Sequence, residues 1–202
     1  MRWVPALAAA AALAAAAVLA AGTARAEGEA AEPGAGERAT PATNRINLRV
    51  GAATSDRNGR PTICLDARVF RGFGIESCGT GQAVLHDDPG REMAHFRGTW
   101  TLLTRHTDRG TGKLRAGAGF AELQVGVDHP GFTFGSPDAA DRGSISGPEA
   151  VVQGQWLVPL GRGVEAIASL TAGAAAFANA DELVVPQRAV QPFVSFELGL
   201  GW

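Results

Sequence analysis

The chain has 202 residues, of which 46% are hydrophobic and 19% are charged, and its formal net charge is −2. So balanced a charge gives no basic surface of the kind that nucleic-acid-binding proteins present, and we expect no nucleic-acid partner. The two cysteines form no Cys-x-x-Cys pair, which argues against redox catalysis of the thioredoxin type. Glycine is frequent, with 27 residues, and separates short apolar runs along the chain.

The N-terminus has the three parts of a cleavable secretory signal. Arg2 supplies the positive charge, residues 4–22 form an apolar run, and Ala24-Arg25-Ala26 is a small-x-small cleavage site. We therefore predict a signal peptide over residues 1–26. An uncleaved membrane anchor is the alternative.

A leader and one domain follow this signal. Residues 27–43 are rich in Glu, Ala, Gly and Pro and hold no large apolar residue, which predicts a disordered leader. Residues 44–202 have the length of one domain. They contain no run of about 18 apolar residues, so we expect no conventional membrane-spanning helix there.

Apolar and polar residues alternate through most of this domain, which is typical of strands with one apolar and one polar face. The final segment alternates best, with large apolar residues at every second position from Val194 to Trp202. Eight strands are predicted, near residues 45–53, 61–70, 73–80, 93–104, 113–127, 149–160, 164–176 and 189–202.

The connections between these strands mostly alternate between long and short. The first, third, fifth and seventh are polar and mostly long, the second and sixth are tight, and the fourth, 105–112, is intermediate. Short turns at one end and longer loops at the other are typical of outer-membrane barrels. The predicted fold is therefore all-β, an eight-stranded antiparallel up-and-down transmembrane β-barrel.

The polar face of the predicted strands carries charges of both signs. In a narrow barrel these side chains would pair inside the lumen, because buried charges need partners. The predicted lumen charge network consists of Arg49, Asp66, Arg68, Glu76, Arg97, Glu122, Glu165 and Glu197. The alternative is a soluble periplasmic barrel of lipocalin type, with these charges in water and a small apolar ligand inside.

Three tryptophans fall near the ends of even-numbered strands, on the apolar face: Trp100, Trp156 and Trp202. In an up-and-down barrel those strand ends lie at one level. Aromatic rings at one level form the belt that membrane barrels place at the lipid–water interface. Phe70 and Phe73 flank the second connection at the same level, although the parity of Phe70 points inward. The alternative is three core tryptophans of a soluble protein.

The C-terminal strand resembles the terminal strand of bacterial outer-membrane proteins, in its alternating apolar residues and its last aromatic residue. The matching positions are Phe196, Leu198, Leu200 and Trp202, with Trp where Phe is usual. With the signal and eight strands, the chain resembles the small OmpA-type, OmpX-type and OmpW-type barrels of Gram-negative bacteria. This resemblance implies an outer-membrane location, lipid contact, and recognition by the barrel assembly machinery.

The two cysteines of the mature chain are expected to form a disulfide, because exported proteins meet oxidising conditions. A hairpin that turns at residues 70–72 pairs Val69 with Phe73 and sets Cys64 opposite Cys78. The same register sets Asp66 opposite Glu76, which requires an arginine between them. Two free buried thiols are the alternative.

Two segments break the simple pattern. In 113–127 the apolar residues change parity, and a β-bulge near Phe120-Ala121 would restore it. Residues 164–178 are Ala-rich and have high helix propensity, but Glu165, Ser169 and Thr171 share one parity and favour a strand.

No catalytic, cofactor or metal site is expected. None of the histidines has metal-ligand spacing to a second ligand. His86-Asp87-Asp88 is interpreted as a solvated loop cluster rather than a cation site. A lipid-modifying outer-membrane enzyme would need a positioned Ser–His pair, for which His95, Ser169 and Glu165 are the candidates.

The loop 128–148 places two phenylalanines, Phe132 and Phe134, among Gly, Pro and Asp residues. They suggest contact with a partner or lipid, or a lid folded over the barrel mouth. The leading hypothesis is a non-enzymatic, non-conducting outer-membrane barrel with a structural or surface-interaction role. The surface partner stays unidentified.

Overall fold

The computed structural model describes residues 45–56, 59–81, 85, 90–126, 132–138 and 143–202. The predicted signal peptide and leader, and the cluster His86-Asp87-Asp88, lie outside the described residues.

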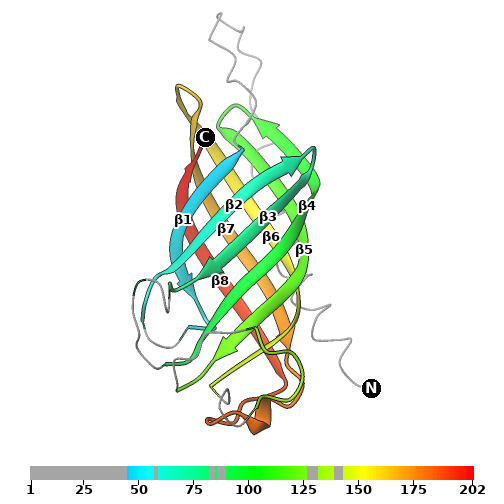
Figure 1. Cartoon of the computed structure of the whole chain (residues 1–202). Helices are drawn as coiled ribbons and strands as arrows, with labels where there is room; N and C mark the ends of the chain where they lie inside the picture. The colour runs from blue at the N-terminus through cyan, green and yellow to red at the C-terminus, as the bar shows by residue number, and fades with distance from the viewer. Residues whose placement is uncertain (1–44, 57–58, 82–84, 86–89, 127–131, 139–142) are drawn as a thin grey trace, which may run out of the picture.

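Eight antiparallel strands form a closed ring, which we call the barrel (Figure 1). Each strand pairs with the next along the chain, and the last pairs with the first, so the topology is up-and-down. The strands are β1 (Ile46–Ala53), β2 (Thr62–Phe70), β3 (Phe73–Gly79), β4 (Glu92–Thr107), β5 (Gly110–Gln124), β6 (Ser144–Gly161), β7 (Val164–Ala176) and β8 (Val190–Gly201). A 3-10 turn, η1 (Ala180–Glu182), lies between β7 and β8.

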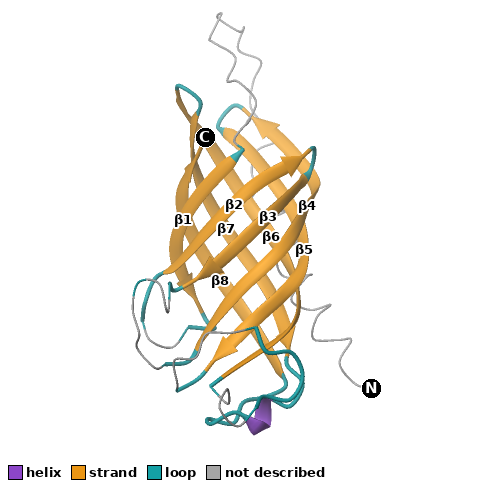
Figure 2. Ribbon diagram, viewed as in Figure 1, coloured by secondary structure: helices purple, strands orange, loops and turns teal. Residues whose placement is uncertain are grey.

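The two ends of the barrel differ (Figure 2). The short β2–β3, β4–β5 and β6–β7 turns and the C-terminus lie at one end, which we call the turn end. The longer connections and η1 lie at the other, the loop end. The eight predicted strands and the alternation of connections are confirmed. The β4–β5 connection is shorter than expected, because the strands stay paired up to Thr107 and Gly110.

The predicted bulge at Phe120-Ala121 is wrong. β5 pairs without interruption through this point with both β4 and β6. The register shifts instead lie near the turn end, between Arg68 and Phe70, between Thr101 and Leu103, and between Pro159 and Gly161. The parity change has another cause: Ala121 and Leu123 point inward and are fully buried in an apolar cluster.

The Ala-rich segment is a strand, as the shared parity of its polar residues predicts. It pairs on both edges, with β6 and with β8. Helix propensity is overridden here because two neighbouring strands saturate its backbone hydrogen bonds.

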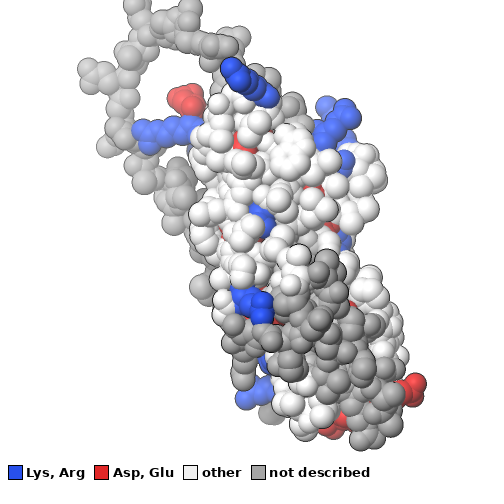
Figure 3. Space-filling view, turned by 60° about the vertical axis from the view of Figure 1, so that its left-hand side comes forward, with Lys and Arg blue, Asp and Glu red and all other residues white. Residues whose placement is uncertain are grey.

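The polarity of the barrel is inverted relative to a water-soluble sheet. Charged side chains such as Arg49, Glu76 and Glu197 are 0% exposed inside the ring. Large apolar side chains on the opposite parity, such as Leu65, Ile75 and Leu198, are at least half exposed on the outer wall. In Figure 3 most of the visible wall is uncharged.

Candidate functional site

The middle of the lumen holds an ion-paired layer centred on Glu76 of β3. Its carboxylate pairs with Arg49 of β1 and accepts a 2.6 Å hydrogen bond from Nε of Arg97 on β4. Gln153 of β6 donates a third hydrogen bond of 2.9 Å from Nε2. Two arginines and one amide on three other strands therefore satisfy a carboxylate that is fully buried.

A second pair extends this layer toward the loop end. Nδ1 of His95 lies 2.7 Å from Oε2 of Glu149, and Nη1 of Arg97 lies 3.7 Å from the same oxygen. Ser169 accepts a 3.0 Å hydrogen bond from Nη1 of Arg49. The structure thus pairs His95 with Glu149 and Ser169 with Arg49. It does not assemble the set of His95, Ser169 and Glu165 that an acyl-transfer site would use.

A third ion pair lies closer to the turn end. Arg115 of β5 pairs with Asp66 of β2 and donates a 3.0 Å hydrogen bond from Nη1 to Oε1 of Gln153. The register places Asp66 opposite Glu76, as predicted. Their repulsion is offset because each carboxylate has its own arginine partners.

Most of the predicted lumen charges face the interior. Those nine-tenths or more buried on the inner parity are Arg49, Asp66, Glu76, Arg97, Glu165 and Glu197, whereas Arg68 is exposed near the turn end. The prediction that Glu122 belongs to the lumen network is wrong. Its neighbours Ala121 and Leu123 point inward, so Glu122 lies on the outer parity, buried at the loop end beside Ser146.

Sequence reasoning missed Arg115 and Glu149 as members of the network. The sequence contains the signal for Arg115, because its neighbours Leu114 and Ala116 are apolar, which places Arg115 on the polar face of an alternating strand. Glu149 lay at the predicted start of its strand. β6 begins at Ser144, so Glu149 sits well inside it with inward parity.

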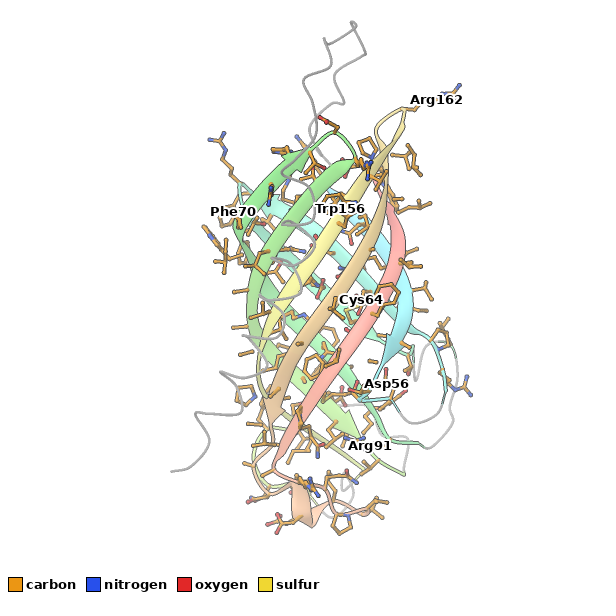
Figure 4. The ribbon with its side chains drawn as sticks, turned by 180° about the vertical axis from the view of Figure 1, so that it is seen from behind. Asp56, Cys64, Phe70, Arg91, Trp156 and Arg162 are labelled. Atoms are coloured by element: carbon orange, nitrogen blue, oxygen red, sulfur yellow. A yellow bond between two sulfur atoms is a disulfide. The ribbon has the colours of Figure 1, made fainter. Side chains whose placement is uncertain are left out.

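Cys64 and Cys78 form the predicted disulfide. They lie directly opposite one another on β2 and β3, and both are buried on the inner face. Figure 4 shows Cys64 within the barrel. Nη2 of Arg97 lies 3.7 Å from the Cys78 sulfur, so the disulfide adjoins the ionic layer.

The loop end of the lumen is closed by apolar side chains. Phe177, Ala180 and Leu183 come from the β7–β8 connection and pack against inward residues of the strands. The cluster consists of Met93, Ala121, Leu123, Val125, Ile145, Val151, Ala175, Phe177, Ala180, Leu183 and Phe193. Nothing in the alternation of apolar and polar residues predicts that this connection folds across the mouth.

Aromatic rings gather on the outer wall near the turn end. Trp100, Trp156 and Trp202 are 49%, 40% and 54% exposed. Phe70 also faces outward, contrary to its predicted parity, because the register shift after Arg68 reverses its direction. Its ring stacks on Phe73 at 4.9 Å between centroids, and Figure 4 shows Phe70 and Trp156 near the same end.

A second aromatic cluster lies at the loop end. Phe132 packs edge-on against Phe96 of β4 and Phe120 of β5, with centroid distances of 5.2 and 5.3 Å. Phe134 contacts Phe120 at 5.8 Å. The two phenylalanines predicted on the loop therefore pack along the outer wall and do not cover the mouth as a lid.

The apolar residues of the C-terminal strand face outward, as the alternation predicts. Phe196, Leu198, Leu200 and Trp202 all face outward and are about half exposed. The backbone N–H of Trp202 donates to Ile46 at 3.0 Å, which extends the β1–β8 seam to the turn end.

Among the described residues, no three His, Cys, Asp or Glu side chains lie close enough together to hold a metal ion. No helix in the described part of the chain is long and apolar enough to cross a membrane. No protein-family model, curated protein or solved structure matches this chain.

Proposed function

We propose that the chain is an integral outer-membrane β-barrel protein with a structural or surface-interaction role. The observation that carries this proposal is the inverted polarity of the barrel, with ion pairs inside and a continuous apolar wall outside. An apolar wall of this extent is unfavourable in water and favourable in hydrocarbon.

The height of the apolar wall supports the proposal. On β8 the outward positions from Pro192 to Trp202 are all apolar and exposed. Ten residue steps of about 3.3 Å span about 33 Å along a strand. At a tilt of about 40° this gives a band of roughly 25 Å, which matches the apolar band of outer-membrane barrels.

The two aromatic clusters support the same reading. Indole and phenyl rings are favoured where hydrocarbon meets the headgroup layer. The cluster of Trp100, Phe70 and Phe73 lies near the turn end, and that of Phe96, Phe120 and Phe132 near the loop end. The wall between them is the proposed lipid-facing surface.

The interior supports a non-conducting and non-catalytic role. Paired charges fill its middle and an apolar cluster closes its loop end. A soluble barrel with an apolar ligand would need an apolar interior, the reverse of the observed burial. An acyl-transfer enzyme would need Ser169 free to meet His95, but Ser169 bonds to Arg49.

The proposed orientation follows from the export signal and the even strand number. Both ends of the barrel chain lie at the turn end, which would face the periplasm from which the protein inserts. The loop end, with Asp56 and Arg91 (Figure 4), would face outward. The barrel assembly machinery is the proposed partner during insertion, through the C-terminal strand.

Fractionation of expressing cells tests this proposal. We expect the protein in the membrane pellet, extractable only by detergent, with a gel mobility that changes on boiling. A Leu198→Arg variant, on the lipid-facing wall, should lose most of the heat-shifted folded form. A Val184→Arg variant, exposed in the β7–β8 connection, serves as the matched control. Release of the wild-type protein with the soluble periplasm would contradict the proposal.

A further inference from the structure

The turn end of the lumen opens into a small cavity of about 30 Å³. A water molecule needs roughly 10–15 Å³ of such space, so the cavity has room for about two waters. A ligand there is limited to a small polar group. The lining includes Arg45, Asn47, Asp66, Arg68, Lys113 and Arg115.

The cavity lining has an excess of positive charge. Four lining side chains are cationic, and Asp66 is the one carboxylate among them. Asp66 is already engaged, because it pairs with Arg115 and accepts a 3.3 Å hydrogen bond from Nδ2 of Asn47. Glu165 of β7 is near enough to interact electrostatically with Lys113. Four cations still face two carboxylates at this mouth.

The surroundings reinforce this excess. Each of the three turns at this end carries an exposed arginine: Arg71 on β2–β3, Arg109 on β4–β5 and Arg162 on β6–β7. Asp108 is the one exposed carboxylate among the described turn residues. Figure 4 shows Arg162 at the tip of its turn, and Figure 3 shows Lys and Arg side chains around this end. Such a rim draws anions toward the mouth.

We propose that this mouth binds a phosphate-type oxyanion, held by Lys113 and Arg45 with the other lining cations around it. Guanidinium and ammonium groups both suit tetrahedral phosphate oxygens. A phosphate group at this end could belong to a phospholipid headgroup or to a free phosphate ester. This inference goes beyond the proposed function, because a binding mouth is not required for a structural barrel.

Lys113 is the only lysine in the chain, so it reports on the cavity alone. The experiment uses the mature chain with [¹³C,¹⁵N]lysine, folded in zwitterionic detergent. Inorganic phosphate is titrated against chloride at constant ionic strength. We expect a saturable shift of the Lys113 side-chain signal. Arg45→Gln should weaken phosphate binding about tenfold, the loss typical of one charge-assisted hydrogen bond. Arg162→Gln, at the same end but outside the cavity, should change it less than twofold.

A second arm separates the two sources of phosphate. The labelled protein is compared in a phosphate-free detergent, in phosphatidylcholine nanodiscs and in nanodiscs that also contain phosphatidylglycerol. A Lys113 shift that appears in nanodiscs but not in the detergent alone, and is lost in Arg45→Gln, assigns the mouth to a lipid headgroup. A shift with inorganic phosphate alone assigns it to a free oxyanion.

Two results would overturn the inference: no Lys113 shift in either arm, or equal weakening by Arg45→Gln and Arg162→Gln, which would mean general attraction by a basic end. If the chain proves soluble, the phosphate titration still decides the question alone. Failure of the proposed function and failure of this inference are therefore distinguishable.

Discussion

Arg115 of β5 reaches across the lumen to pair with Asp66 of β2, although two strands lie between β2 and β5 on one side of the ring and four on the other. Both side chains are nearly inaccessible to solvent. Their contact joins two strands that are not neighbours in the ring, so it stabilises the cross-section of the barrel.

Removing one partner of the Arg115–Asp66 pair should lower the stability of the barrel strongly. Arg115→Met leaves Asp66 buried without its main cation, and we expect the free energy of unfolding to fall by about 3–5 kcal/mol. Urea titration of the protein in lipid vesicles or micelles measures this change. The double variant Asp66→Asn with Arg115→Met should recover much of the loss. Arg109→Met, exposed on the β4–β5 turn, should cost less than about 0.5 kcal/mol. Equal losses in the single and double variants would refute the pairing.

The disulfide should stabilise the β2–β3 hairpin. Cys64 and Cys78 are 14 residues apart, and a closed loop of about this length contributes about 3 kcal/mol. Replacing both by Ser should lower the free energy of unfolding by that order. Intact mass measured before and after reduction should differ by about two daltons, as two hydrogens are gained. An unchanged mass would mean that the thiols are free.

Close approach of β1 and β8 depends on Gly199. A Cβ placed there would lie 2.0 Å from the carbonyl oxygen of Leu48. Gly199→Val should therefore open the seam and reduce the folded, heat-shifted fraction by an amount equivalent to about 3 kcal/mol. Leu198→Val, the outward neighbour, should leave that fraction nearly unchanged. A fully folded Gly199→Val protein would show that the seam can adjust.

The filled interior should block solute passage. In planar bilayers we expect the conductance of the purified protein to match the lipid control, because ion pairs and the apolar cluster occupy the lumen. A porin with 16 strands serves as the positive control. Stable conductance steps well above the lipid background would contradict this expectation.

The local features of this fold could be predicted from the sequence because strands have a period of two. Alternation located all eight strands, and hairpin register placed Cys64 opposite Cys78. The contacts across the lumen could not be predicted in the same way. Which residue reaches Asp66 depends on how the sheet is staggered when it closes, and Arg115 lies 49 residues from Asp66 in the sequence.

The side chains at the loop end are a second feature that could not be predicted from the sequence. The parity of Leu123 and Val125 predicts a bulge near Phe120-Ala121, if apolar residues face outward along the whole strand. They face inward because the β7–β8 connection brings Phe177 and Leu183 over the mouth. A contact with a distant loop therefore decides which parity faces inward here, and the alternation within the strand does not predict that contact.

The β1–β8 seam joins Asn47 to Gly201, the two most distant parts of the described chain. Until β8 arrives, β1 keeps a free edge that can pair with any other strand, and the apolar wall has no closed surface. Contacts so far apart in sequence also form slowly. A chain of this design is therefore exposed to aggregation while the barrel is open, and that exposure ends in a single event when the last strand docks on the first.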